Sequence, residues 1–105
     1  MRALIIDDEP KSRHLLQTLI QREFPDIEII GTVADGKEGI QKIKQLNPDV
    51  LFLDINMPGM SGFEMLQALQ PVTFDTVFIT AYDQFAIKAF RYHAFDYLLK
   101  PIDLA

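Results

Sequence analysis

The stretch Val50-Leu51-Phe52-Leu53-Asp54-Ile55-Asn56-Met57-Pro58-Gly59 decides the fold of this chain. It opens with four apolar residues, continues into an aspartate and ends in a proline and a glycine, which favour a turn. A short unbroken apolar run before a turn is typical of a strand that is buried on both faces of a sheet. We therefore predict a buried strand over residues 50–53 with Asp54 at its carboxyl end.

Four other short apolar runs accompany this one. Those over 3–6, 77–79 and 97–99 are nearly unbroken, and we expect them to be buried on both faces. The run over 27–33 is interrupted by polar residues, so we expect an edge strand there. Between the runs, apolar residues recur at helical spacing over 15–24, 40–46, 63–69 and 85–90.

This alternation predicts an α/β fold, a doubly wound sheet of five parallel strands. Such a sheet carries helices on both faces, yet only four helical segments precede Ala105. We therefore expect a fifth, C-terminal helix that is missing from residues 1–105. The face covered by the first helix should then expose apolar surface.

The amino-acid composition excludes several classes of protein. The 105 residues suit a single domain, and 10 basic against 15 acidic side chains give a net charge of −5. This balance argues against nucleic-acid binding by residues 1–105, and the lack of cysteine excludes disulfides and thiolate metal sites. No apolar run approaches the roughly 20 residues of a membrane span, and no signal peptide is visible, so we expect a cytoplasmic protein.

Charged and polar residues follow the predicted strands where a doubly wound sheet forms its sites. Asp7-Asp8-Glu9 follow the first strand, and Asp54, Thr80 and Lys100 follow the third, fourth and fifth. An Asp-Asp-Glu-Pro turn repels an anion but suits a hard divalent cation. Asp7, Asp8 and Asp54 match the oxygen ligands of Mg²⁺.

Simpler roles exist for each residue taken alone. The Asp7–Asp8 pair would also suit a helix N-cap, Asp54 a turn cap, Thr80 an ordinary strand end, and Lys100 a solvated surface. Their convergence favours phosphoryl chemistry, because a carboxylate can be a nucleophile toward phosphorus. A nearby hydroxyl, an ammonium and Mg²⁺ would then each contact one phosphoryl oxygen on Asp54.

Four motifs together resemble the receiver domain of two-component response regulators over the whole chain. They are Leu4-Ile5-Ile6-Asp7-Asp8-Glu9-Pro10, residues 53–62, Thr80-Ala81 and Tyr97-Leu98-Leu99-Lys100-Pro101. The resemblance implies a flavodoxin-like strand order 2-1-3-4-5. It also implies that a sensor histidine kinase phosphorylates Asp54. Mg²⁺ would be bound directly by Asp8, Asp54 and the main-chain carbonyl of Asn56, and through water by Asp7. Thr80 and Lys100 would sense the phosphoryl group.

A finer resemblance lies in residues 80–90 and 94–102, which are similar to receivers of the LytTR class (LytR/AlgR-like). Intact proteins of that class carry a C-terminal DNA-binding domain after the receiver. By this resemblance, residues 1–105 form the regulatory domain of a transcription regulator. DNA would be bound only by a domain beyond residue 105.

The resemblance also places a conformational switch at Thr80 and Tyr97, read out by the fourth helix and fifth strand. On that surface we expect Phe85, Ala86, Ala89 and Phe90 to face the sheet, and Lys88, Arg91, Tyr92 and Asp96 to face solvent. The mixed charges would suit a twofold homodimer. A merely solvated helix face and ordinary strand packing of Tyr97 stay open.

Two other functions compete with a phosphoacceptor switch. An aspartyl phosphatase typically has a second aspartate two residues after the nucleophile, where this chain has Asn56. A pure interaction domain would have lost an acidic residue or Lys100, and both are present. We expect a stoichiometric phosphoacceptor rather than a multiple-turnover enzyme.

Overall fold

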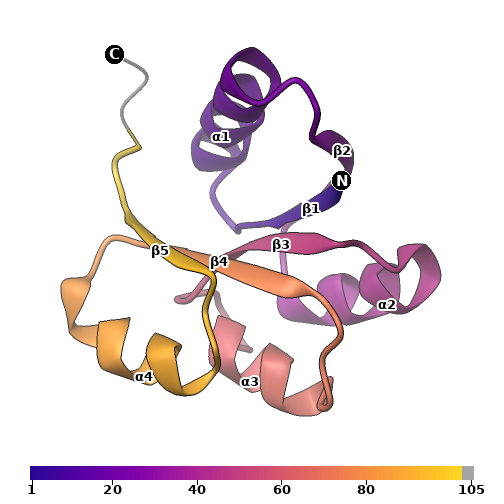
Figure 1. The fold of residues 1–105 in the computed structure, drawn as a ribbon. Helices are drawn as coiled ribbons and strands as arrows, with labels where there is room; N and C mark the ends of the chain where they lie inside the picture. Colours follow the sequence, from indigo (N-terminus) through magenta and orange to yellow (C-terminus); the bar gives the residue numbers. More distant parts are fainter. Residues whose placement is uncertain (103–105) are drawn as a thin grey trace.

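The chain folds around a parallel sheet with helices on both faces (Figure 1). The computed structural model describes residues 1–102. Its strands are β1 (Arg2–Ile6), β2 (Glu28–Val33), β3 (Val50–Asp54), β4 (Asp75–Thr80) and β5 (Asp96–Leu99). Its helices are α1 (Pro10–Glu23), α2 (Gly36–Leu46), α3 (Gly62–Ala68) and α4 (Ala86–Arg91), the last preceded by the 3₁₀ turn η1 (Asp83–Phe85). The strand order β2-β1-β3-β4-β5 confirms the predicted doubly wound, flavodoxin-like fold.

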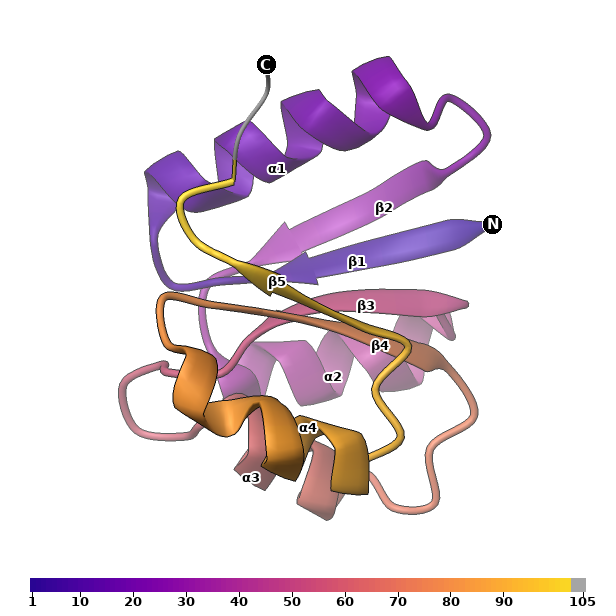
Figure 2. The same ribbon diagram turned by 60° about the vertical axis from the view of Figure 1, so that its left-hand side comes forward.

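The two faces of the sheet carry separate apolar cores, because successive strand residues point to opposite sides. Ala3 and Ile5 of β1 pack with Leu16 and Ile20 of α1 on one face. Leu4 of β1 and its neighbours pack against α2, α3 and α4 on the other. Among the described residues α1 is alone on its face, as both views show (Figures 1 and 2).

An apolar groove lies beside α1 on this thinly covered face. It encloses about 600 Å³ and is lined by side chains of α1, the central strands and β5, among them Leu16, Ile20, Phe52 and Leu98. The expected exposed apolar surface is therefore present. Phe24, expected to extend the buried stripe of α1, instead caps the helix and is 56% exposed.

The edges of the sheet match the predicted strand order, but the burial of β5 does not match its prediction. β2 is an edge strand, as expected from its interrupted apolar run. β5 forms the other edge, as the implied strand order requires, but it was expected to be buried on both faces and its Leu99 is 50% exposed. An unbroken apolar run does not reveal how completely the helices cover the strand that it forms.

The orientation expected for α4 is wrong at three positions. Phe90 is 81% exposed and Ala86 is also exposed, whereas Tyr92 is half-buried and stacks on Phe63 with ring centroids 5.2 Å apart. The stripe that faces the core is Phe85, Ala89 and Tyr92, spaced by four and three residues. Adjacent apolar pairs in this segment fit two helical faces, and packing selects one. The remaining residues of this surface face solvent as predicted, namely Lys88, Arg91 and Asp96.

Among the described residues 1–102, none of the helices combines the length and the hydropathy of a membrane-spanning segment.

Candidate functional site

Four carboxylates meet where the central strands end. Asp7 directly follows β1, Asp54 is the last residue of β3, and Asp8 and Glu9 form the turn into α1. Each offers an oxygen within 4.8 Å of the others. Asp7 and Asp54 are 1% and 3% exposed, whereas Glu9 is exposed. The structure thus brings together the three predicted aspartates and adds Glu9, for which no role was predicted.

The aspartate pair is not the N-cap of α1. That position is taken by Glu9, whose side chain makes no capping hydrogen bond. Asp7 Oδ1 accepts the Glu9 amide at 2.9 Å, and the guanidinium of Arg13 donates to the Asp7 main-chain carbonyl at 2.7 Å. The turn between β1 and α1 is therefore held from both sides, with the aspartate carboxylates aimed at the rim of the sheet.

Lys100 reaches this rim from the residue after β5. Its Nζ donates to Glu9 Oε1 at 2.5 Å and to Asp7 Oδ1 and Asp54 Oδ2 at 3.3 Å each. Burial by itself would lower the pKa of the ammonium. The hydrogen bond to Glu9 and the charges of Asp54 and Asp7 outweigh burial and raise the pKa above its usual range. The structure thus places the Lys100 ammonium among the carboxylates of the rim.

The environment of Asp54 raises the pKa of its carboxyl group. Burial disfavours its charged form, and the Asp7 carboxylate repels that form further. Lys100 opposes both effects, but the pKa of Asp54 still rises to about 8. Without a metal ion, the cluster therefore favours a proton on Asp54.

The donor set fits a hard divalent cation. Asp7 Oδ2 is buried and accepts no hydrogen bond, although Lys100 Nζ lies 3.2 Å away. Buried carboxylate oxygens normally have full sets of partners, so this oxygen has room for one more. Mg²⁺ prefers oxygen ligands, so it would fill the free acceptor on Asp7 and would favour the ionised form of Asp54.

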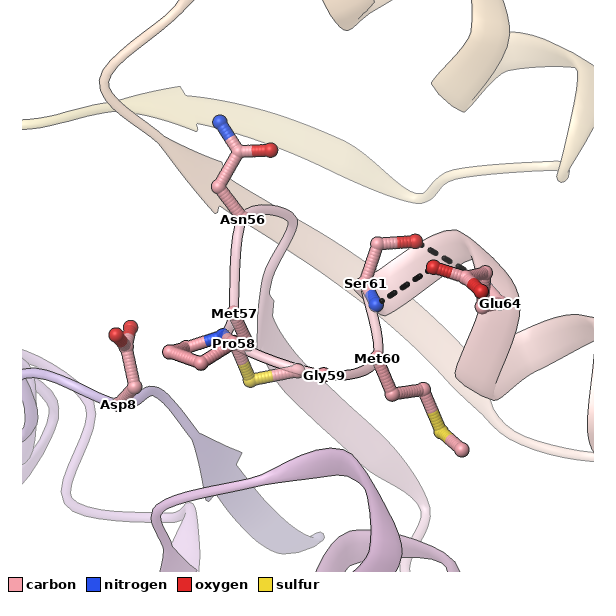
Figure 3. Close-up of a pocket in the computed structure, with 8 residues that line it drawn as sticks. All are labelled: Asp8, Asn56, Met57, Pro58, Gly59, Met60, Ser61 and Glu64. Atoms are coloured by element: carbon pink, nitrogen blue, oxygen red, sulfur yellow. Dashed lines mark hydrogen bonds between the residues drawn. The ribbon is translucent and has the colours of Figure 1, made fainter.

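The loop after β3 completes the rim. Asn56, Gly59 and Ser61 line a pocket of about 520 Å³ together with Asp8 (Figure 3). The loop ends in a capping box, in which Ser61 Oγ accepts the Glu64 amide and the Glu64 carboxylate accepts the Ser61 amide, both at 3.1 Å. This box starts α3 and fixes the position at which the loop leaves the site.

Thr80 and Tyr97 are connected through the main chain of Tyr82. The Thr80 hydroxyl is buried and its Oγ1 accepts the Tyr82 amide at 3.2 Å. The Tyr97 hydroxyl donates to the Tyr82 carbonyl, and burial, chiefly, raises its pKa. Sequence reasoning predicted both ends of this connection but missed Tyr82, because a residue that acts through its main chain leaves no side-chain signature.

Comparison with known proteins agrees with this geometry. The family model of the response regulator receiver domain matches residues 3–105. The transcriptional regulatory protein BtsR of Escherichia coli is 54% identical over 106 residues, which cover 100% of this chain but 44% of that protein. The chain thus spans less than half the length of this curated relative.

Two solved structures carry the same fold. The response regulatory domain of mrkE from Klebsiella pneumoniae superposes with a TM-score of 0.90 at 34% identity, covering 99% of this chain and 86% of that chain. Response regulator TrrA from Thermotoga maritima, solved in complex with Mg(2+)-BeF, gives 0.83 at 33% identity and covers 97% and 88%. The chain therefore belongs to the response regulator receiver domain family.

Proposed function

We propose that this domain is a phosphorylation-activated switch in which Asp54 accepts a phosphoryl group from a sensor histidine kinase. The observation that carries the proposal is the position of Asp54, at the end of a buried strand beside Asp7 and Asp8 and in contact with Lys100. An O–P bond would form at the Asp54 carboxylate as the P–N bond to the kinase histidine breaks. The electron pair of that bond would leave with the imidazole nitrogen.

In this proposal Mg²⁺ is held directly by Asp8, Asp54 and the main-chain carbonyl of Asn56, and through water by Asp7. When bound, the ion neutralises negative charge on the transferring group. Lys100 and Thr80 then contact the remaining phosphoryl oxygens. The unfilled acceptor on Asp7 and the pocket that Asn56 shares with Asp8 support this assignment.

The connection between Thr80 and Tyr97 supports a switch at these two residues. A phosphoryl group on Asp54 would draw the Thr80 hydroxyl toward it and away from the Tyr82 amide. The Tyr82 carbonyl, which holds the Tyr97 hydroxyl, would shift in consequence. The Tyr97 ring would then turn inward, so that a local charge change selects between two arrangements of the segment before α4.

The surface of α4 and β5 is the proposed readout and homodimer interface. Ile87 and Phe90 project from α4 with 74% and 81% of their surface exposed. The exposed basic residues Lys88 and Arg91 flank them, and Asp96 at the start of β5 is also exposed. A surface that carries apolar side chains and charges of both signs can pair with itself about a twofold axis.

We further propose that the output is transcriptional, through a C-terminal DNA-binding domain of the LytTR type. The protein would act in the cytoplasm, where both the DNA and the phosphodonor are present. The 44% coverage of BtsR, whose name describes a transcriptional regulator, supports a longer parent protein. A fifth helix after residue 105 would cover the groove beside α1. The groove's apolar lining supports that placement.

Labelling with acetyl phosphate and Mg²⁺ tests the proposal by intact-mass measurement. We expect one phosphoryl group on the wild type and none on Asp54→Asn. The control Asp26→Asn removes an exposed carboxylate near the start of β2 and should be labelled like the wild type. Full labelling of Asp54→Asn would place the acceptor elsewhere. Many turnovers of a generic phosphate ester would indicate a phosphatase, and no labelling at all an interaction domain.

A further inference from the structure

The shortest contact of the Lys100 ammonium is with Glu9, not with the acceptor aspartate. Nζ lies 2.5 Å from Glu9 Oε1, compared with 3.2 Å from Asp7 Oδ2 and 3.3 Å from Asp54 Oδ2. All three ammonium protons are engaged by carboxylates. Glu9 is thus a full member of the Lys100 environment.

Glu9 differs from the other two acids in exposure and in freedom. Its side chain is 61% exposed, whereas those of Asp7 and Asp54 are almost fully buried. It occupies the N-cap of α1, where a carboxylate would ordinarily accept main-chain amides, yet it makes no such bond. Its carboxylate is therefore free to follow Lys100.

This difference has a consequence when a cation enters the cluster. Mg²⁺ and the Lys100 ammonium would share the oxygens of Asp7 and Asp54, and the two cations repel each other. Lysine has a long flexible side chain with about 2 kcal/mol of rotamer entropy to gain in solvent. If Lys100 had no carboxylate partner besides Asp7 and Asp54, Mg²⁺ binding would release it from the rim just before the phosphoryl transfer to Asp54.

We propose that Glu9 is a positioning residue that keeps Lys100 above Asp54 while the aspartates hold Mg²⁺. The proposal rests on the phosphoacceptor function of Asp54 given above. Glu9 acts through Lys100 and does not itself touch the phosphoryl group. As the phosphoryl oxygens arrive, the Lys100 ammonium redirects one N–H hydrogen bond from an aspartate to them and keeps its contact with Glu9.

Glu9→Gln tests this inference, because the amide keeps the shape of the side chain but loses the charge. Phosphorylation by acetyl phosphate at saturating Mg²⁺ should slow by about 1.5- to 5-fold, the range expected for a single exposed ion pair. The matched control is Glu23→Gln, which removes the same charge from the other end of α1, about 20 Å away along the helix. It should leave the rate unchanged.

A second readout follows the ammonium itself. The Lys100 Nζ signal in ¹⁵N–¹H spectra, assigned by its loss in Lys100→Met, should be protected from solvent exchange in the wild type with and without Mg²⁺. In Glu9→Gln the protection should be lost when Mg²⁺ is added. A rate that falls while the protection persists would mean that Glu9 acts through its charge on the metal, which overturns the inference. An unchanged rate would overturn it too.

The two proposals fail in different ways. If the wild type is never labelled, the phosphoacceptor function is wrong. If the wild type is labelled on Asp54 but Glu9→Gln matches it in rate or retains a protected Lys100 signal with Mg²⁺, only the role of Glu9 is wrong. Glu9 is exposed, so the variant should fold, and an unchanged melting temperature for the metal-free protein to within a few degrees verifies this.

Discussion

Gly62 packs so closely against the main chain of Asp54 that a Cβ on Gly62 would lie 2.6 Å from the Asp54 carbonyl oxygen. The Gly62 amide also donates to the Ile55 carbonyl at 2.8 Å, which returns the loop to the end of β3. The main chain that carries the carboxylate of Asp54, the proposed acceptor, is therefore positioned by a residue that must lack a side chain. Space, rather than a left-handed conformation, is the requirement at this glycine.

Gly62→Ala should accordingly destabilise the fold by about 1–3 kcal/mol, because backbone atoms must shift to admit the methyl group. It should also slow the labelling of Asp54. The measurement is urea unfolding followed by circular dichroism. Gly59→Asn is the control, since nothing lies within 4 Å of a Cβ at this position and asparagine tolerates its φ of +80°. Equal effects of the two changes would contradict this explanation.

The raised pKa of Asp54 predicts an unusual pH dependence for the metal-free domain. A folded-state pKa of about 8, against an ordinary 3.8, means that the folded protein binds this proton more tightly than the unfolded chain. The stabilisation is fully present below the ordinary value and is lost as pH rises toward 8, by up to about 1.4 kcal/mol per pH unit. Urea unfolding between pH 5 and pH 8 should show the decline.

Asp54→Asn is the matched variant for this profile, because it removes the titrating group while keeping its shape. Its free energy of unfolding should change less over the same pH range. Saturating Mg²⁺ should likewise flatten the wild-type profile by favouring the ionised carboxylate. A slope that is the same in wild type and Asp54→Asn would assign the pH dependence to another group.

Asp8→Ala should raise the melting temperature of the metal-free domain and remove its stabilisation by Mg²⁺. Four carboxylates approach within 4.8 Å, so deleting one relieves repulsion by about 1 kcal/mol, the Coulomb energy of close charges in near-aqueous surroundings. Such a change corresponds to about 4–8 °C for a domain of this size. Thermal scans with and without Mg²⁺ measure both effects. An unchanged response to Mg²⁺ would refute the assignment of Asp8 as a ligand.

Truncation of Phe63 should lower the free energy of unfolding, whereas truncation of Phe90 should affect association and leave stability almost unchanged. Phe90 is 81% exposed, so Phe90→Ser should leave the free energy of unfolding within about 0.5 kcal/mol of wild type and weaken association of the phosphorylated domain. Phe63 is 3% exposed and packs against Phe78, so Phe63→Ala should cost about 3–5 kcal/mol. Unfolding and analytical ultracentrifugation separate the two effects. A strongly destabilised Phe90→Ser would show that this ring is part of the core.

The contact between Lys100 and Glu9 lay beyond the reach of sequence reasoning. Both residues were placed at the rim from the chain order of the strands. Which carboxylate the ammonium approaches, however, depends on the path of β5 and on the free N-cap of α1. Residues 91 positions apart in sequence carry no local signal of such a pairing.

Local patterns in the sequence determined the elements and their layering. The run before Asp54 indicated a buried strand because it is short and ends at a turn, and its alternation with segments of helical spacing indicated parallel strands. Tertiary packing alone decided that Leu99 of β5 is exposed, that Phe90 points to solvent while Tyr92 packs on Phe63, and that Asp54 is forced toward a proton. These features depend on the distances between residues that are far apart in the sequence, and local patterns in the sequence do not contain those distances.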